Sequence, residues 1–144
     1  MKENVTHYSR YFTNLGSSVP TTKTHDYVLD AWWVNYQKKH EFNPLHNHTG
    51  VYSFVIWVKI PTEFEKQHDI QLKKGIHPQG AVAGDFEFEY TNIIGNHSSF
   101  VYNMGQYIEG KMVFFPSELR HCVYPFYECD EERVSVSGNI CLGT

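Results

Sequence analysis

Two histidines, His46 and His48, stand two residues apart just before a long apolar stretch. In an extended chain, side chains at positions i and i+2 point to the same face, so both imidazoles can reach one point. Imidazole is a ligand for iron, zinc, copper and nickel. The spacing therefore predicts part of a metal site, to be completed by a third ligand from elsewhere in the chain. The alternative is a polar turn in which one histidine satisfies backbone groups.

Two residues near the other end of the chain have the right chemistry to join such a site. His121 lies after a predicted strand at 111–115, and Arg133 opens the last predicted strand, with Ser135 on the same face. An arginine that points into a protein interior needs an anionic partner, and its planar fork suits a carboxylate. The alternative for Arg133 is a surface salt bridge with Asp130 or Glu131.

The elements that must position these residues are short strands separated by turn residues. Strand-favouring residues or alternation mark them, and Pro61 and Pro116 end two of them. Such a series predicts an all-β sandwich or barrel of the jelly-roll kind. The predicted strands are 27–36, 42–48, 51–60, 85–90, 100–102, 111–115 and 133–142.

Two segments carry more specific predictions. Residues 62–84 are charged and broken by glycine and proline, with a helix conceivable only around 62–73, and we expect a long connection that acts as a lid or contacts substrate. Residues 85–90 alternate acid and aromatic strictly, which predicts a half-exposed strand. Its aromatic residues, Phe86, Phe88 and Tyr90, should face the core, and its acidic residues, Asp85, Glu87 and Glu89, should face water.

The composition indicates one folded domain. The chain has 144 residues, enough for a hydrophobic core, and we divide it into an N-terminal arm (1–25) and a jelly-roll domain (26–144). The net charge of -4 gives no support for binding nucleic acid, and no apolar stretch is long enough to span a membrane. Three cysteines without a CxxC pair indicate neither a disulfide framework nor a zinc knuckle, so a cytoplasmic location is expected, in the host cell if the source is viral.

An ordered series of segments resembles a known family. It comprises Trp33-Val34-Asn35, the run from Asn43 to His48 with the strand after it, Phe114 to Ser117 with His121, and Arg133-Val134-Ser135. The series is similar to the Fe(II)/2-oxoglutarate-dependent oxygenases, in particular to small members from bacteria and from viruses (phages) that infect them. The resemblance spans residues 26–140.

The resemblance implies a double-stranded β-helix, which is a cupin-like jelly roll. It also implies that His46 is the first iron ligand and His121 the distal one. Arg133, helped by Ser135, would bind the distal carboxylate of 2-oxoglutarate. Fe(II), 2-oxoglutarate and O₂ would then oxidise a substrate, by hydroxylation, with release of succinate and CO₂.

One position departs from the family pattern. The common pattern is His-x-Asp or His-x-Glu, whereas the second position here is His48. Either the metal is held by three histidines, His46, His48 and His121, or His48 stands outside its ligands. A carboxylate from Glu87 or Glu89 is not expected, because their alternation points them to water. Asn35 either reaches the cosubstrate or makes a structural hydrogen bond.

Three functions follow from this pattern. The first is an Fe(II)- and 2-oxoglutarate-dependent dioxygenase. The second is a cupin-like three-histidine dioxygenase that uses no 2-oxo acid. The third is a non-catalytic jelly-roll binding or structural module. The substrate, a small molecule or a protein side chain, is not named by the sequence, and a homodimer is a further expectation.

Overall fold

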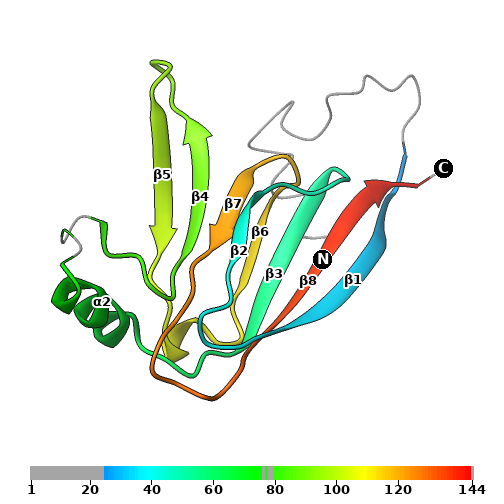
Figure 1. The fold of residues 1–144 in the computed structure, drawn as a ribbon. Coiled ribbons are helices and arrows are strands. Elements are labelled where there is room, and N and C mark those ends of the chain that lie inside the picture. Colours follow the sequence, from blue (N-terminus) through cyan, green and yellow to red (C-terminus); the bar gives the residue numbers. More distant parts are fainter. Residues whose placement is uncertain (1–24, 76, 78–79, 144) are drawn as a thin grey trace.

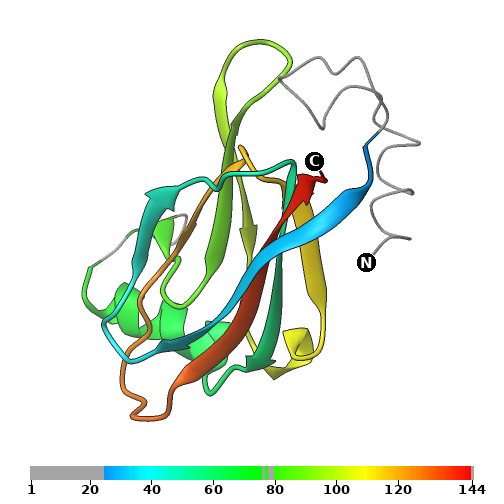
Figure 2. The same ribbon diagram turned by 90° about the vertical axis from the view of Figure 1, so that its right-hand side faces the viewer.

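Two antiparallel sheets face each other in the computed structural model, which describes residues 25–75, 77 and 80–143. One sheet has the strand order β1-β8-β3-β6, and the other has the order β2-β7-β4-β5 (Figures 1 and 2). Apart from the hairpin of β4 and β5, neighbouring strands are not consecutive in the chain, as in a jelly roll. The strands are β1 (Tyr27–Gln37), β2 (Asn43–His46), β3 (Tyr52–Lys59), β4 (Phe86–Thr91), β5 (His97–Tyr102), β6 (Met112–Pro116), β7 (Arg120–Val123) and β8 (Arg133–Leu142).

The space between the sheets holds an aromatic core. Trp57 and Phe115 come from one sheet, and Phe86 and Phe88 come from the other; all four are buried. The ring centroids of Trp57 and Phe86 lie 5.4 Å apart, and those of Phe88 and Phe115 lie 4.9 Å apart, both in edge-to-face arrangements. Such pairs add about 0.5–1.5 kcal/mol each beyond the burial of their area. Packing between these rings therefore fixes the spacing of the two sheets.

The register of β8 places a line of polar residues on the inner face of its sheet. Opposite residues of paired strands share a face. Gln37 lies opposite Arg133, and Asn35 lies opposite Ser135. On the other side of β8, Ser135 lies opposite the core residue Trp57. The side chain of Arg133 is therefore directed inward.

The predicted exposure of Asp85 and Glu87 to water is wrong, and so is the predicted burial of Tyr90. Asp85 is fully buried, Glu87 is only 8% exposed, and Tyr90 is 43% exposed. The carboxylate of Asp85 is bonded to His68, and that of Glu87 accepts a hydrogen bond from the hydroxyl of Tyr124. Partners from other elements therefore cover the outer side of β4, where the alternation predicted solvent.

The long connection 62–84 contains the helix α2 (Phe64–Lys73), and a short 3-10 helix η2 (Gln106–Ile108) precedes β6. Glu65 in the first turn of α2 and Lys73 in its last turn suit the helix dipole, and Lys73 also pairs with Asp69 at 2.6 Å. Gly75 follows with a φ of 85° and donates its N–H to the carbonyl of Leu72, which ends the helix.

In the described part of the chain, no helix is long and apolar enough to cross a membrane.

Two further expectations concern the N-terminal arm and the position of His121. The predicted arm, residues 1–25, lies outside the described residues except for His25. His121 was expected to follow the predicted strand 111–115, and it lies inside a further strand, because β7 begins at Arg120. That position matters for the site, because pairing within a sheet fixes where a side chain points.

Candidate metal centre and cavity

Three histidines from two strands and a loop meet at one place. His46 ends β2, His121 lies directly opposite it on β7, and His48 follows in the loop after β2. One ring nitrogen from each lies within 4.8 Å of the other two. The structure therefore brings together the three histidines that the sequence singled out.

Hydrogen bonds to backbone carbonyls orient two of these rings. Nδ1 of His46 is 2.7 Å from the carbonyl oxygen of Pro44, and Nδ1 of His121 is 3.0 Å from that of Leu119. A carbonyl oxygen only accepts, so each Nδ1 carries the proton and donates it. The lone pair of each ring is then on Nε2, which is the arrangement found around histidines that bind metals.

Burial keeps the rings of His121 and His48 uncharged at neutral pH. Burial is the main cause that lowers the pKa of His121, to about 4, with smaller contributions from His46 and His48. Burial, followed by His46, also lowers the pKa of His48. Neutral imidazole is the form that binds a metal. At neutral pH both rings are therefore ready to act as ligands.

The distance between two of the donor nitrogens is that of ligands on one divalent transition metal ion. Nε2 of His48 lies 3.2 Å from Nε2 of His121. Two nitrogen ligands about 2.1 Å from one ion and at right angles to each other lie about 3 Å apart. The other explanation of this distance is a hydrogen bond in which His48 carries its proton on Nε2. Among the described residues, this ligand group contains only histidines.

Glu87 does not supply a carboxylate to this group. Glu87 pairs with Cys122, whereas the next residue of β4, Phe88, pairs with His121. Glu87 and His121 therefore lie on opposite faces of the sheet. The expectation that Glu87 is not a ligand holds, although the reason is register and not exposure to water.

A cavity of about 860 Å³ extends from the three histidines to Arg133. Its walls include Trp33, the core residues Trp57 and Phe86, and a polar line along β1 and β8. That line consists of Asn35, Gln37, Ser135 and Ser137. The space is large enough for a small dicarboxylate and part of a second molecule.

Arg133 is buried at the end of the cavity away from the histidines, with 2% of its surface exposed. Nη2 donates to the carbonyl of Gly84, Nη1 donates to Oε1 of Gln37, and the buried Nε has no partner. Burial lowers the pKa of Arg133 to about 10, and Asp85 opposes that shift, so the group stays charged at neutral pH. A buried charge with a free N–H beside a cavity is a site for an anion.

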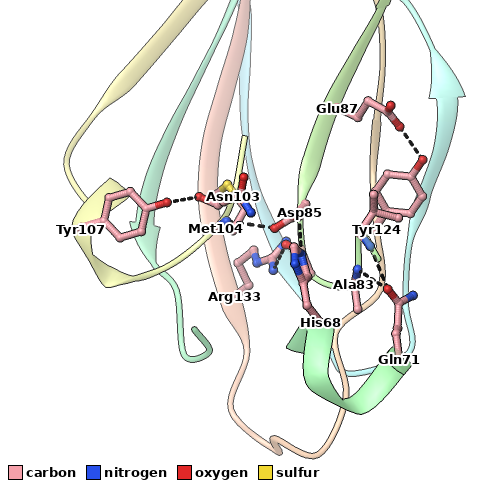
Figure 3. A network of polar contacts seen from close by, with 12 residues as sticks. His68, Gln71, Ala83, Asp85, Glu87, Asn103, Met104, Tyr107, Tyr124 and Arg133 are labelled. Atoms are coloured by element: carbon pink, nitrogen blue, oxygen red, sulfur yellow. Dashed lines mark hydrogen bonds and ion pairs between the residues drawn. The ribbon is translucent and has the colours of Figure 1, made fainter. Parts of the chain in front are cut away.

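The surface salt bridge considered for Arg133 is wrong. Asp130 pairs with Lys39 and Glu131 pairs with Lys59, at the protein surface. Arg133 is instead next to the buried carboxylate of Asp85. Figure 3 shows Asp85 bonded to the backbone N–H of Met104 and to His68 on α2, beside Arg133.

The sequence does not reveal this network, since the alternation in 85–90 predicted that Asp85 faces water. Nε2 of His68 is 2.7 Å from Oδ2 of Asp85. Burial raises the pKa of Asp85, and the bonds from Met104 and His68 partly oppose that effect. No local pattern marks a pair that joins a helix to the start of a strand, so the sequence offered no signal for it.

The expected role of segment 62–84 as a lid or substrate contact gains no support from its described residues. None of its described residues belongs to the cavity walls. Instead, the side chain of Gln67 on α2 bonds the backbone of Tyr127, and Gln71 accepts the N–H groups of Val82 and Ala83. The segment therefore packs next to Asp85 and Arg133, at the end of the cavity away from the histidines.

Asn35 makes the structural hydrogen bonds that were one of its two expected roles. Its amide nitrogen lies 3.3 Å from the hydroxyls of Ser135 and Ser137 and donates to both. The three side chains line the cavity together. The hydroxyl protons of the serines remain available to a ligand.

The facing sheets and the order of their strands define the double-stranded β-helix class, which is the cupin-like jelly roll. The sequence matches the model of the family described as "Putative 2OG-Fe(II) oxygenase" over residues 31–139. Because the match covers well over half of the chain, the protein belongs to this family of Fe(II)- and 2-oxoglutarate-dependent oxygenases.

A solved structure supports the assignment of the fold. It is that of "Oxidoreductase, 2OG-Fe(II) oxygenase family, from Burkholderia pseudomallei", which aligns with a TM-score of 0.55 at 14% identity. The alignment covers 83% of this chain and 47% of the other, so this chain spans about half the length of that protein. A comparison with curated proteins gives no significant match. The structural likeness confirms the jelly roll.

The lowered pKa of His121 predicts how the stability of the metal-free protein depends on pH. Between its ordinary value of 6.5 and about 4, the unfolded chain binds a proton at His121 that the folded protein does not bind. The free energy of unfolding should therefore fall as the pH falls through this range, by about 2–3 kcal/mol from this residue. Urea unfolding of the chelator-treated protein at several pH values measures this free energy. The variant His121→Phe should lose that part of the dependence, and an unchanged dependence would contradict the prediction.

Proposed function

We propose that this protein is an Fe(II)- and 2-oxoglutarate-dependent dioxygenase that oxidises, by hydroxylation, a substrate still to be identified. His46, His48 and His121 hold the iron. Arg133 binds the distal carboxylate of 2-oxoglutarate, and Ser135 helps it, with Asn35 orienting the serine. The observation that carries the proposal is a single cavity with three converging imidazoles at one end and a buried, charged guanidinium at the other.

The residues of the chain have separate tasks in this proposal. Bound iron supplies the activation of O₂ and the oxidative decarboxylation of the 2-oxo acid, which gives succinate and CO₂. Arg133 orients the 2-oxo acid along the cavity, because its fork can bind a carboxylate with two hydrogen bonds. Trp57, Phe86 and Phe115 keep water away from the wall between the two ends.

The three-histidine set favours a second candidate, the cupin-like dioxygenase that uses no 2-oxo acid. Three neutral ligands leave a divalent ion with its full charge, whereas the usual carboxylate would cancel part of it. Arg133 argues for the first candidate, since a buried guanidinium with a free N–H has no use in a reaction without an anionic cosubstrate. An anionic 2-oxo acid would also supply the charge that the ligand set lacks.

Formation of succinate separates the two candidates. The protein loaded with Fe(II) and given 2-oxoglutarate and O₂ should form succinate slowly even without substrate, and the variant His121→Ala should form none. The side chain of His97 is 71% exposed. The variant His97→Ala is therefore a matched control, and it should form succinate as the unchanged protein does. Consumption of O₂ that needs Fe(II) but yields no succinate would support the second candidate.

The remaining expectations stay predictions. They are a substrate that is a small molecule or a protein side chain, a location in the cytoplasm, a homodimer, and the division into an arm and one domain.

A further inference from the structure

Gln37 connects Arg133 to the loop that follows β1, which also lines the cavity. It is the last residue of β1, lies directly opposite Arg133 in the register with β8, and belongs to the cavity wall. Oε1 of Gln37 accepts from Nη1 of Arg133 at 3.3 Å. In the described part of the chain, Gln37 is the one side chain that hydrogen-bonds this guanidinium.

The orientation of the Gln37 amide is fixed by its other end. Nε2 donates to the carbonyl of Glu41 at 2.7 Å and faces that of Tyr124 at 3.4 Å. Because carbonyls only accept, the nitrogen must face them, and the oxygen must then face Arg133. A rotated amide would bring two donors together and leave two carbonyls without a donor.

The other neighbours of Arg133 do not replace this contact. The carboxylate of Asp85 binds the N–H of Met104 and His68, as Figure 3 shows, and among the described residues it makes no hydrogen bond to Arg133. The carbonyl of Gly84 holds Nη2, and the guanidinium carbon lies 5.3 Å above the ring of Phe126. These contacts place the group, but rotation of its plane over the ring is limited by the bond to Gln37.

We propose that Gln37 is a positioning residue that makes the cavity prefer a dicarboxylic over a monocarboxylic 2-oxo acid. This inference rests on the proposed function. By holding Nη1, Gln37 turns the unpartnered Nε and the remaining N–H groups of Arg133 to the cavity, where a distal carboxylate would lie. A ligand without that carboxylate gains nothing from the orientation of Arg133, so its affinity should not depend on Gln37.

The test compares two ligands on the Fe(II)-loaded protein without O₂. Dissociation constants are measured by calorimetry for 2-oxoglutarate and for 2-oxobutanoate, which lacks the distal carboxylate. The variant Gln37→Leu should bind 2-oxoglutarate about tenfold more weakly, as expected for loss of a hydrogen bond to a charged group. Its affinity for 2-oxobutanoate should stay within about twofold of that of the unchanged protein. Equal losses for both ligands, or no loss for either, would overturn the inference.

Two further variants make the result specific. Gln106→Leu removes an exposed glutamine outside the cavity and should change neither constant. Gln37→Glu places a carboxylate against Arg133 and should weaken binding of 2-oxoglutarate more than Gln37→Leu does. This variant also tests the inference if the leucine variant does not fold. If the unchanged protein binds no 2-oxoglutarate, the proposed function fails, and this inference fails with it. If the unchanged protein binds and both Gln37 variants bind equally well, only the inference fails.

Discussion

The variant Arg133→Met is expected to lose binding of 2-oxoglutarate, with a dissociation constant raised at least about 100-fold. Hydrogen bonds to a charged group contribute about 1.5–3 kcal/mol each, and a guanidinium can give a carboxylate two of them. Methionine keeps much of the buried volume of the arginine stem, so the cavity wall should persist. Calorimetry with the Fe(II)-loaded protein, without O₂, gives the constants.

Binding of Fe(II) is the internal control for this variant. Arg133 is at the other end of the cavity from the histidines, so the affinity for iron should be unchanged if the fold persists. Lys111→Met, at an exposed cation outside the cavity, should leave both constants as they are. Binding of 2-oxoglutarate to Arg133→Met as tight as to the unchanged protein would show that the cosubstrate lies elsewhere.

The second large effect is expected on binding of the metal. Replacing His46, His48 or His121 singly with alanine should lower the affinity for Fe(II) by on the order of 100-fold or more, because loss even of a group that only orients a ligand costs 10–100-fold. The constants can be measured by competition with a coloured chelator under nitrogen, with His97→Ala as the matched control. Equal losses at all three positions are the result expected for a three-histidine centre. Full affinity in His48→Ala would mean that His48 is not a ligand.

Local periodicity was enough to find the histidine pair and to place Arg133 and Ser135 on one face of their strand. It did not decide whether that face meets the cavity or the solvent, which the pairing of β8 with β1 and β3 now settles. The partner of the pair needed long-range pairing, since β2 meets β7 only in the folded jelly roll. His121 was therefore placed by resemblance and by the expected fold, and the register now brings it opposite His46.

The same periodicity gave the wrong environment for Asp85 and Glu87. Alternation tells which residues share a face, but not whether another element covers that face. Here His68 covers Asp85, and Tyr124 covers Glu87. Gln37 was missed for a related reason, because its importance comes from facing Arg133 across β1 and β8, which are distant in sequence.

Anaerobic titration of the protein with Fe(II), with and without 2-oxoglutarate, tests most directly that one cavity holds both. A weak visible charge-transfer band should appear only when both are present, and it should be absent in Arg133→Met and in His121→Ala. Tight binding of Fe(II) with no band and no change in affinity on adding 2-oxoglutarate would contradict the account.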